Sequence, residues 1–234
     1  MFDEYELKAR YIPSILASVP LMMLSSVFEP EVFISLFRTA DFFLVVKDIG
    51  LSLVVIFLVI HFQRFIGKYL IEAYLFDAET KFPTTEMLLW SDSTLSRASK
   101  NKLHKQVKED FDIDLLNADL EKNDTVEAIK LAIEVVALIR RRVGKGVLTY
   151  QHNIQYGFMR NLIAGSILSL PSSLVAIYVF IVVKPNFIGA VIASIYSVLF
   201  VLLVVFHRQI LKWLANNYAK VLFAEYLTLG GVKR

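Results

Sequence analysis

The stretch NLIAGSILSLPSSLVAIYVFIVV, residues 161–183, is uncharged and long enough to cross a membrane, yet it contains a proline and four serines. A transmembrane helix needs about 20 predominantly apolar residues to cross the roughly 30 Å hydrocarbon core. Three of the serines, Ser166, Ser169 and Ser173, recur with the spacing of one helical face. The stretch therefore predicts a membrane helix with a line of hydroxyl groups along one side.

The composition of the chain agrees with a membrane protein. Hydrophobic residues make up 56% of the 234 residues, and the charged residues, 20%, cluster between apolar runs. Four uncharged runs approach the length of a membrane span: residues 11–28, 49–62, 162–183 and 187–206. The limits of the second run stay open, because the apolar residues 42–46 precede it. Only residues 184–186 separate the last two runs, which predicts a tight antiparallel hairpin.

The distribution of Lys and Arg predicts the orientation, because cytoplasmic loops retain positive charge. Of the 25 Lys and Arg residues, 15 lie between the second and third runs. We therefore expect this segment and both termini in the cytoplasm. The predicted fold is all-α, with four transmembrane helices arranged two and two around a mainly helical cytoplasmic insert. The expected parts are an N-terminal hairpin, 1–76, the insert, 77–155, and a C-terminal hairpin with a cytoplasmic C-terminal helix, 156–234.

Local patterns predict the course of the insert. Pro83 indicates a turn, and the following helix is expected to be capped by Ser93 or Thr94. Residues 110–115 alternate acidic and apolar side chains, as in a short strand or an extended segment. Asp124 with Glu127 forms the pattern of a capping box for the next helix. The apolar side predicted for that helix consists of Val126, Ile129, Ile133, Val136 and Leu138.

Two interpretations of the serines remain open. Small residues at every fourth position let membrane helices pack closely, and hydroxyls can bond to carbonyls that prolines leave free. The same hydroxyls could instead hydrate an ion path without buried charge. Such a path would need a ring of protomers, because four helices fill their own interior. The residues of this pore or helix-packing face are Ser166, Ser169, Ser173, Pro171, Ser14 and Ser18.

Charge is segregated within the insert. Residues 95–108 contain five basic side chains and no acid, whereas residues 109–124 contain seven acids. These blocks are either solvated or paired helix faces, or they include a site for a nucleotide, an oligonucleotide or a lipid headgroup. The ligand-binding candidates are Arg97, Lys100, Lys102, His104, Lys105, Arg140, Arg141, Arg142 and Lys145.

The sequence offers no constellation for catalysis or for a metal. It contains no cysteine, and its four histidines are far apart with no ligand spacing. No serine lies in a nucleophile elbow, and no carboxylate pair has an apolar context. We therefore expect no enzymatic activity, no metal and no cofactor.

Three short motifs resemble a group of small bacterial membrane proteins: FPTT at residues 82–85, DSTL at 92–95 and YGFMRN at 156–161. The overall plan resembles four-span effectors encoded beside nucleotidyltransferases in anti-phage defence, a group that includes the membrane channel component of the Hailong system. The resemblance implies a homo-oligomeric, tetrameric ion channel in the bacterial inner membrane. It also implies gating by a nucleotide product, and membrane depolarisation in an infected cell.

These observations lead to one main hypothesis and one alternative. The main hypothesis is a channel whose insert senses an anionic, nucleic-acid-like ligand and moves the third span about Pro171. Tyr156, Arg160 and Asn161 lie where the insert meets that span, so we expect them to transmit the signal. The alternative is a non-conducting membrane anchor whose insert recruits a soluble partner.

Overall fold

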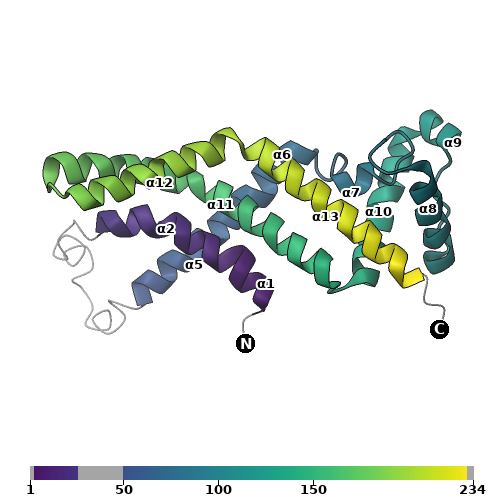
Figure 1. The fold of residues 1–234 in the computed structure, drawn as a ribbon, viewed down its shortest axis with the longest axis horizontal. Coiled ribbons are helices and arrows are strands. Elements are labelled where there is room, and N and C mark those ends of the chain that lie inside the picture. The colour runs from purple at the N-terminus through teal and green to yellow at the C-terminus, as the bar shows by residue number, and fades with distance from the viewer. Residues whose placement is uncertain (1–2, 26–49, 231–234) are drawn as a thin grey trace. The chain divides into compact units, whose positions relative to one another are not determined.

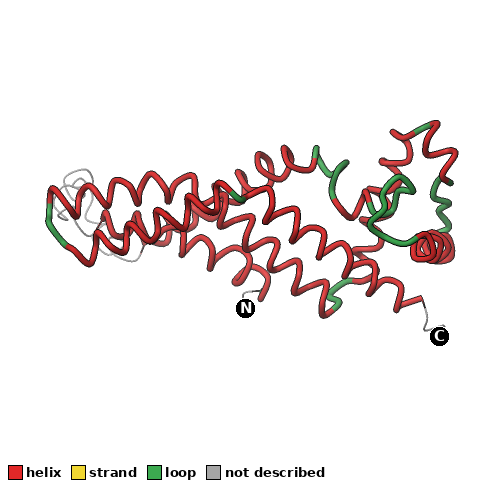
Figure 2. Tube along the Cα trace, turned by 45° about the horizontal axis from the view of Figure 1, so that its top comes forward, coloured by secondary structure: helices red, strands yellow, loops and turns green. Residues whose placement is uncertain are grey.

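The computed structural model describes residues 3–25 and 50–230. Regular secondary structure in these two ranges is entirely helical, and they contain no strand (Figure 2). The all-α prediction is therefore confirmed for the described part of the chain. This part divides into two compact units. Unit 1 contains the described residues up to Lys68 together with Gly157–His207, and unit 2 contains Tyr69–Tyr156 together with the described residues from Arg208 onward.

Unit 1 is built from long apolar helices joined to shorter irregular segments (Figure 1). Its first elements are α1 (Glu4–Glu6), the π-helical segment η1 (Leu7–Tyr11), α2 (Ile12–Ser25) and α5 (Gly50–Phe65). Its later elements are the unit 1 part of α11 (Val147–Tyr178), the π-helical segment η3 (Val179–Val183) and α12 (Phe187–Val205). The π-helical segment η2 (Ile66–Glu72) follows α5 and continues into unit 2.

Within the described residues, two helical stretches are long and apolar enough to cross a membrane. They are Val147–Val183, which combines α11 with η3, and Phe187–Val205, which is α12. They contain the third and fourth predicted spans. The first predicted span coincides with α2 as far as Ser25, and the second with α5 from Gly50 onward. The remainder of these two spans, including residues 42–46, lies outside the described residues.

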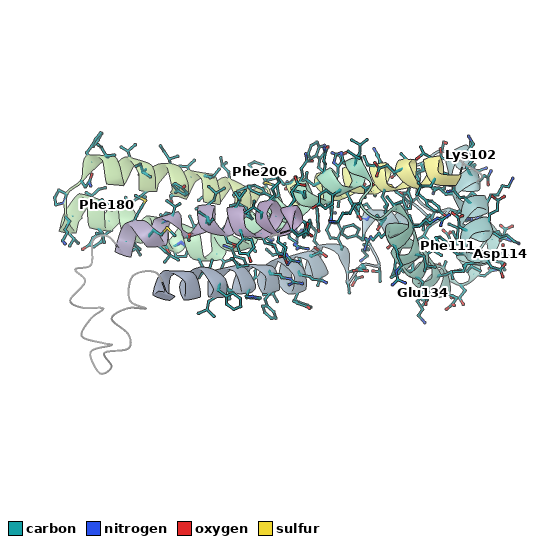
Figure 3. All side chains as sticks on the ribbon, turned by 90° about the horizontal axis from the view of Figure 1, so that it is seen from below. Lys102, Phe111, Asp114, Glu134, Phe180 and Phe206 are labelled. Atoms are coloured by element: carbon teal, nitrogen blue, oxygen red, sulfur yellow. The ribbon has the colours of Figure 1, made fainter. Side chains whose placement is uncertain are left out.

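The hairpin between the last two spans is confirmed. Lys184, Pro185 and Asn186 connect η3 to α12, and the Asn186 side chain caps α12 by accepting from the Gly189 N–H at 3.0 Å. A Cβ atom on Gly189 would lie 3.0 Å from the Phe180 ring, so glycine allows the ring to pack this closely on α12. Phe180, labelled in Figure 3, packs in a buried cluster with Ala176 and Ala193.

Unit 2 combines three short helices with several longer ones. Its elements are α6 (Ala73–Phe76), α7 (Pro83–Glu86), α8 (Arg97–Phe111), α9 (Ala118–Asn123), α10 (Thr125–Val143), the first part of α11, and α13 (His207–Gly230). The residues of α13 that face inward recur with helical spacing: Leu211, Leu214, Ala215, Tyr218, Ala219, Leu222, Phe223 and Tyr226. The C-terminal helix therefore contributes a continuous apolar face to the core of unit 2.

Helix α10 confirms one local prediction and corrects another. Asp124 is its N-cap, and the carboxylate accepts from the Glu127 N–H at 3.0 Å. The buried face, however, is Ala128, Ala132, Val135, Val136 and Ile139. Val126, which we placed on the apolar side, is 65% exposed. The prediction followed the largest apolar side chains, whereas close packing selected the small residues Ala128 and Ala132.

Two further local predictions are corrected. Ser96 caps α8, and its hydroxyl oxygen accepts from the Ser99 N–H, so neither Ser93 nor Thr94 is the cap. Thr94 instead bonds to the Asp92 carboxylate through both its N–H and its hydroxyl, each at 2.9 Å. The alternating stretch after Asp110 forms no strand: α8 continues to Phe111, and residues 112–117 have no regular structure. No neighbouring strand in the described ranges offers backbone partners to this stretch.

Candidate functional site

The ammonium group of Lys100 lies inside unit 2. The residue is 1% exposed, and Nζ donates to the backbone carbonyls of Leu89 and Asp92. The Asp92 carboxylate lies 3.9 Å away, which compensates the buried charge in part. Burial lowers the pKa of Lys100, although Asp92 and Glu121 act in the opposite direction. These contacts give Lys100 a role in holding the loop before α8, residues 87–96. We therefore remove Lys100 from the set of ligand-binding candidates.

His104 holds the same loop one helical turn later. Its Nε2 atom lies 2.8 Å from the carbonyl oxygen of Leu88, and its ring packs against Trp90 at a centroid distance of 4.7 Å. Burial lowers the pKa of His104. A neutral ring that donates to a backbone carbonyl is a poor anion ligand, so His104 also belongs to the fold rather than to a ligand site.

Glu121 fixes the other side of the loop. Its two carboxylate oxygens accept from the N–H groups of Trp90 and Ser91, at 2.7 and 2.9 Å, and the residue is 5% exposed. The Trp90 indole donates to the carbonyl of Leu116 at 2.9 Å. The loop is thus held by α8 on one side and by α9 with the segment before it on the other. Sequence reasoning missed Glu121, because it lies in an acidic block in which nothing marks one carboxylate as buried.

A cluster of four aromatic rings and one arginine joins five segments of unit 2. We call Phe76, Phe82, Arg140, Tyr156 and Tyr218 the Phe82 cluster. The Phe82 ring contacts Phe76 at 4.7 Å and Tyr156 edge-to-face at 5.8 Å, between ring centroids. The Arg140 guanidinium carbon lies 5.7 Å from the Phe82 ring centroid and 5.9 Å from that of Tyr218. Arg140 therefore makes cation–π contacts with two rings.

Polar contacts anchor the Phe82 cluster at two points. Arg140 Nη2 donates to the Thr84 hydroxyl at 3.2 Å, and the Tyr156 hydroxyl donates to Glu72 Oε2 at 3.0 Å. The cluster brings together two residues that were expected to act separately, Arg140 as a ligand-binding residue and Tyr156 as a coupling residue. It also includes Phe82, the first residue of the FPTT motif. The spacing of these residues in the sequence gave no sign that they meet.

The three coupling candidates contact segments that continue into the predicted spans. Within unit 1, a Cβ atom on Gly67 would lie 3.3 Å from the Cγ atom of Arg160, so the Arg160 side chain packs directly on η2. Within unit 2, Tyr156 bonds to Glu72 at the other end of η2. Asn161 Nδ2 donates to the carbonyl of Ala9 at 2.6 Å. Tyr156 and Arg160, one helical turn apart on α11, thus contact opposite ends of η2. π-Helical segments of this kind are frequent at functional sites.

The remaining basic candidates are exposed but do not form one patch. They are Arg97, Lys102, Lys105, Arg141, Arg142 and Lys145. Figure 3 shows Lys102, Asp114 and Glu134 at the periphery of unit 2. Arg142 lies 3.8 Å from Asp110 near the C-terminal end of α8, about 20 Å along that helix from Arg97 at a rise of about 1.5 Å per residue. Lys105 pairs with Glu109 at 3.8 Å. The best-grouped cations are therefore Arg141, Arg142 and Lys145, at and just beyond the C-terminal end of α10.

The serine face is buried inside unit 1. Ser166, Ser169 and Ser173 are each 0% exposed, Ser14 is 2% exposed and Ser18 is 4% exposed, whereas Pro171 is exposed. The Ser169 hydroxyl lies within hydrogen-bond distance of the carbonyls of Ala17 on α2 and Gly165 on α11. The carbonyl four residues before Pro13 is that of Ala9, and its partner is Asn161 rather than a serine. The Ser14 and Ser169 hydroxyls therefore connect helices within one protomer. The hydroxyls of Ser18, Ser166 and Ser173 bond to carbonyls of their own helices.

No group of three or more metal-ligating side chains occurs among the described residues. No protein-family model, curated protein or solved structure matches this chain.

Proposed function

We propose that this chain is a four-span protein of the bacterial inner membrane that forms a homo-oligomer, with a tetramer favoured. Both termini and the insert lie in the cytoplasm. An anionic nucleotide or oligonucleotide bound to the insert gates ion conduction through the assembled membrane helices and so depolarises the cell. The ligand would come from a partner nucleotidyltransferase in an anti-phage defence system, as the resemblance implies.

The packing of unit 1 supports four spans. If α11 crosses the membrane, the helices that contact it lie at the same depth. The Ser169 hydroxyl bonds to Ala17 on α2, and Ser14 on α2 bonds to Gln63 on α5 at 2.6 Å. These hydrogen bonds join three apolar helices through groups that would be costly to leave unpaired in hydrocarbon.

The Phe82 cluster is the observation that carries the gating proposal. Arg140 lies in the cluster, and the next two residues of α10, Arg141 and Arg142, are exposed cations. Tyr156 lies in the same cluster, on the helix that continues as the candidate span Val147–Val183. Binding of an anion at the end of α10 would thus act on side chains in direct contact with the base of that span. If the Phe82 cluster has two packing arrangements, a ligand that favours one of them would change the state of the pore.

Ion flux from liposomes tests the proposal. We would reconstitute the wild-type protein and record flux with and without short oligonucleotides and cyclic nucleotides. The double variant Arg141→Gln/Arg142→Gln should lose the ligand-dependent change in flux, and Lys220→Gln, an exposed charge on α13, should keep it. Cross-linking in the same liposomes reports the number of protomers. Equal responses of both variants would remove the end of α10 from the sensor.

The non-conducting anchor remains the second candidate, because the burial of the serine face favours it. Hydroxyls that are all bonded within one protomer, either between helices or to their own helix, need no pore to explain them. The anchor hypothesis expects no flux under any condition from folded, inserted protein. It further expects that Arg141→Gln/Arg142→Gln abolishes capture of a soluble partner.

A further inference from the structure

Three helices of unit 1 bring buried polar side chains together. Ser14 lies on α2, Gln63 on α5 and Asn161 on α11, and these residues are 2%, 1% and 2% exposed. Gly165 lies one turn after Asn161 on the same helix, and a Cβ atom there would approach Gln63 Nε2 to 2.6 Å. We call Ser14, Gln63, Asn161 and Gly165 the Gln63 site. Its three polar side chains are all shielded from solvent within one protomer.

The hydrogen bonds within the Gln63 site are incomplete. Ser14 Oγ lies 2.8 Å from the carbonyl oxygen of Arg10 and 2.6 Å from Gln63 Oε1, but a hydroxyl has one hydrogen to donate. The Gln63 Nε2 group, at the other end of the amide, has no hydrogen-bond partner. Asn161 is held in one orientation, because its Nδ2 group must donate to the carbonyl of Ala9, and this leaves Oδ1 without a partner.

Rotation of the Gln63 amide does not remove the problem. Exchanging its oxygen and nitrogen lets Nε2 donate to Ser14, whose own hydrogen then goes to Arg10. The amide oxygen of Gln63 is then the unpaired atom above Gly165. In one orientation the site has an unpaired donor and an unpaired acceptor, and in the other it has two unpaired acceptors. Each unpaired polar group in an apolar interior lowers the stability of the fold.

We propose that the Gln63 site binds an ordered water molecule that bridges the side-chain amides of Gln63 and Asn161. Water both donates and accepts, so it completes the site in either orientation of Gln63, whereas a cation would fit only the orientation with two acceptors. Asn161 and Gly165, the residue that Gln63 Nε2 approaches, lie one turn apart on α11, roughly 6 Å along its axis, and one water between two partners spans a comparable distance. The inference stands whether or not the protein conducts ions.

Water-edited solid-state NMR on the wild-type protein in lipid bilayers tests the proposal directly. The protein is labelled uniformly with ¹⁵N, and magnetisation is transferred from water protons to its side-chain and backbone nitrogens. We expect several-fold faster transfer to Gln63 Nε2 and Asn161 Nδ2 than to the backbone amide of Ala176, which is 0% exposed. Transfer to both side chains as slow as to Ala176 would overturn the proposal.

Two glycine variants make the test specific. Gly165→Ala places a methyl group 2.6 Å from Gln63 Nε2 and should abolish the fast transfer to Gln63 and Asn161. Gly189→Ala introduces a clash of its own, 3.0 Å from the Phe180 ring, at the other end of the last hairpin, and should leave the transfer unchanged. Loss of the signal in both variants, or its persistence in Gly165→Ala, would contradict a water bound at this site. If Gly165→Ala does not fold, the wild-type measurement still decides.

Discussion

Asp77, Ala78 and Glu79 have left-handed backbone conformations, with φ values of 48°, 50° and 79°. None of them is glycine, and each such residue stores strain because its Cβ atom crowds the backbone. The turn is held from both sides. The Lys81 N–H donates to the carbonyl of Phe76 at 3.0 Å, and the Thr85 hydroxyl donates to the carbonyl of Glu79 at 3.0 Å. The strained turn leads directly into Phe82, so it sets the position of the Phe82 cluster.

Ala78→Gly should stabilise the protein by about 1 kcal/mol, because glycine adopts this conformation without the Cβ penalty. Thermal unfolding of the full-length protein in detergent measures the change. The matched control is Ala137→Gly, an exposed position in the middle of α10, where glycine should cost about 1 kcal/mol. A loss of stability in both variants would show that the turn is not strained.

Individual side chains also show what the charge pattern did not reveal. Lys100 and His104 stand in a basic block and were expected to bind a ligand, yet both donate to backbone carbonyls of the loop before α8. The spacing of basic residues along a helix identifies which of them share a face. It does not identify the faces that other segments cover, because that depends on contacts distant in sequence.

The start of α11 depends on a side chain from another helix. The carboxylate of Glu225, on α13, accepts from the N–H groups of Leu148 and Thr149 at 2.9 and 3.1 Å. These are unpaired donors of the first turn of α11, so Glu225 acts as a cap supplied from 76 or more residues away. Gly146 is needed just before this turn, because a Cβ atom there would lie 2.2 Å from Glu225 Oε2. The sequence next to α11 offers no sign of this cap.

The pH dependence of stability should reveal the Glu225 cap. Burial raises the pKa of Glu225, but contacts with the Thr149 hydroxyl and with the two N–H groups, together with the charge of His152, outweigh burial and lower the pKa overall. A lowered pKa in the folded state contributes stability above the ordinary carboxyl value of 4.5, and this contribution is lost as the pH falls through the folded pKa.

Glu225→Gln should therefore cost about 1 kcal/mol at neutral pH, the usual worth of a helix cap, and progressively less below pH 4.5. Chemical denaturation of wild type and variant at a series of pH values measures the difference. The control is Glu134→Gln, an exposed carboxylate on α10, which removes the same charge without touching a helix end. A difference for Glu225→Gln that stays constant as the pH falls would contradict the cap.

Across the molecule, three connections join the two units of the chain: Lys68–Tyr69, Tyr156–Gly157 and His207–Arg208. The first lies in η2, and the last lies just after Phe206, where α12 ends and α13 begins. Arg160 packs on η2 within unit 1, and Tyr156 bonds to the end of η2 within unit 2. If the proposed function is right, a signal between insert and spans passes through these residues.

Arg160→Ala should keep the oligomeric state but lose ligand-gated conductance, because the side chain that packs on Gly67 is removed. Liposome flux measures conductance, and cross-linking reports assembly. The control is Arg64→Ala, an exposed arginine near the end of α5. Gating that survives Arg160→Ala would remove this residue from the mechanism, and loss of assembly would assign it to structure alone.

The sequence by itself determined the helical class, the last two apolar helices with their three-residue connection, and the cap of α10, because all of these follow from patterns between neighbouring residues. Only the tertiary structure decided that the serines are buried against α2, that Arg140 meets Phe82 and Tyr156, and that Gln63 and Asn161 keep unpaired amide atoms. The physical reason is the same in each case. Periodicity specifies which face of a helix is polar or apolar, whereas the partner of that face comes from a segment far along the chain.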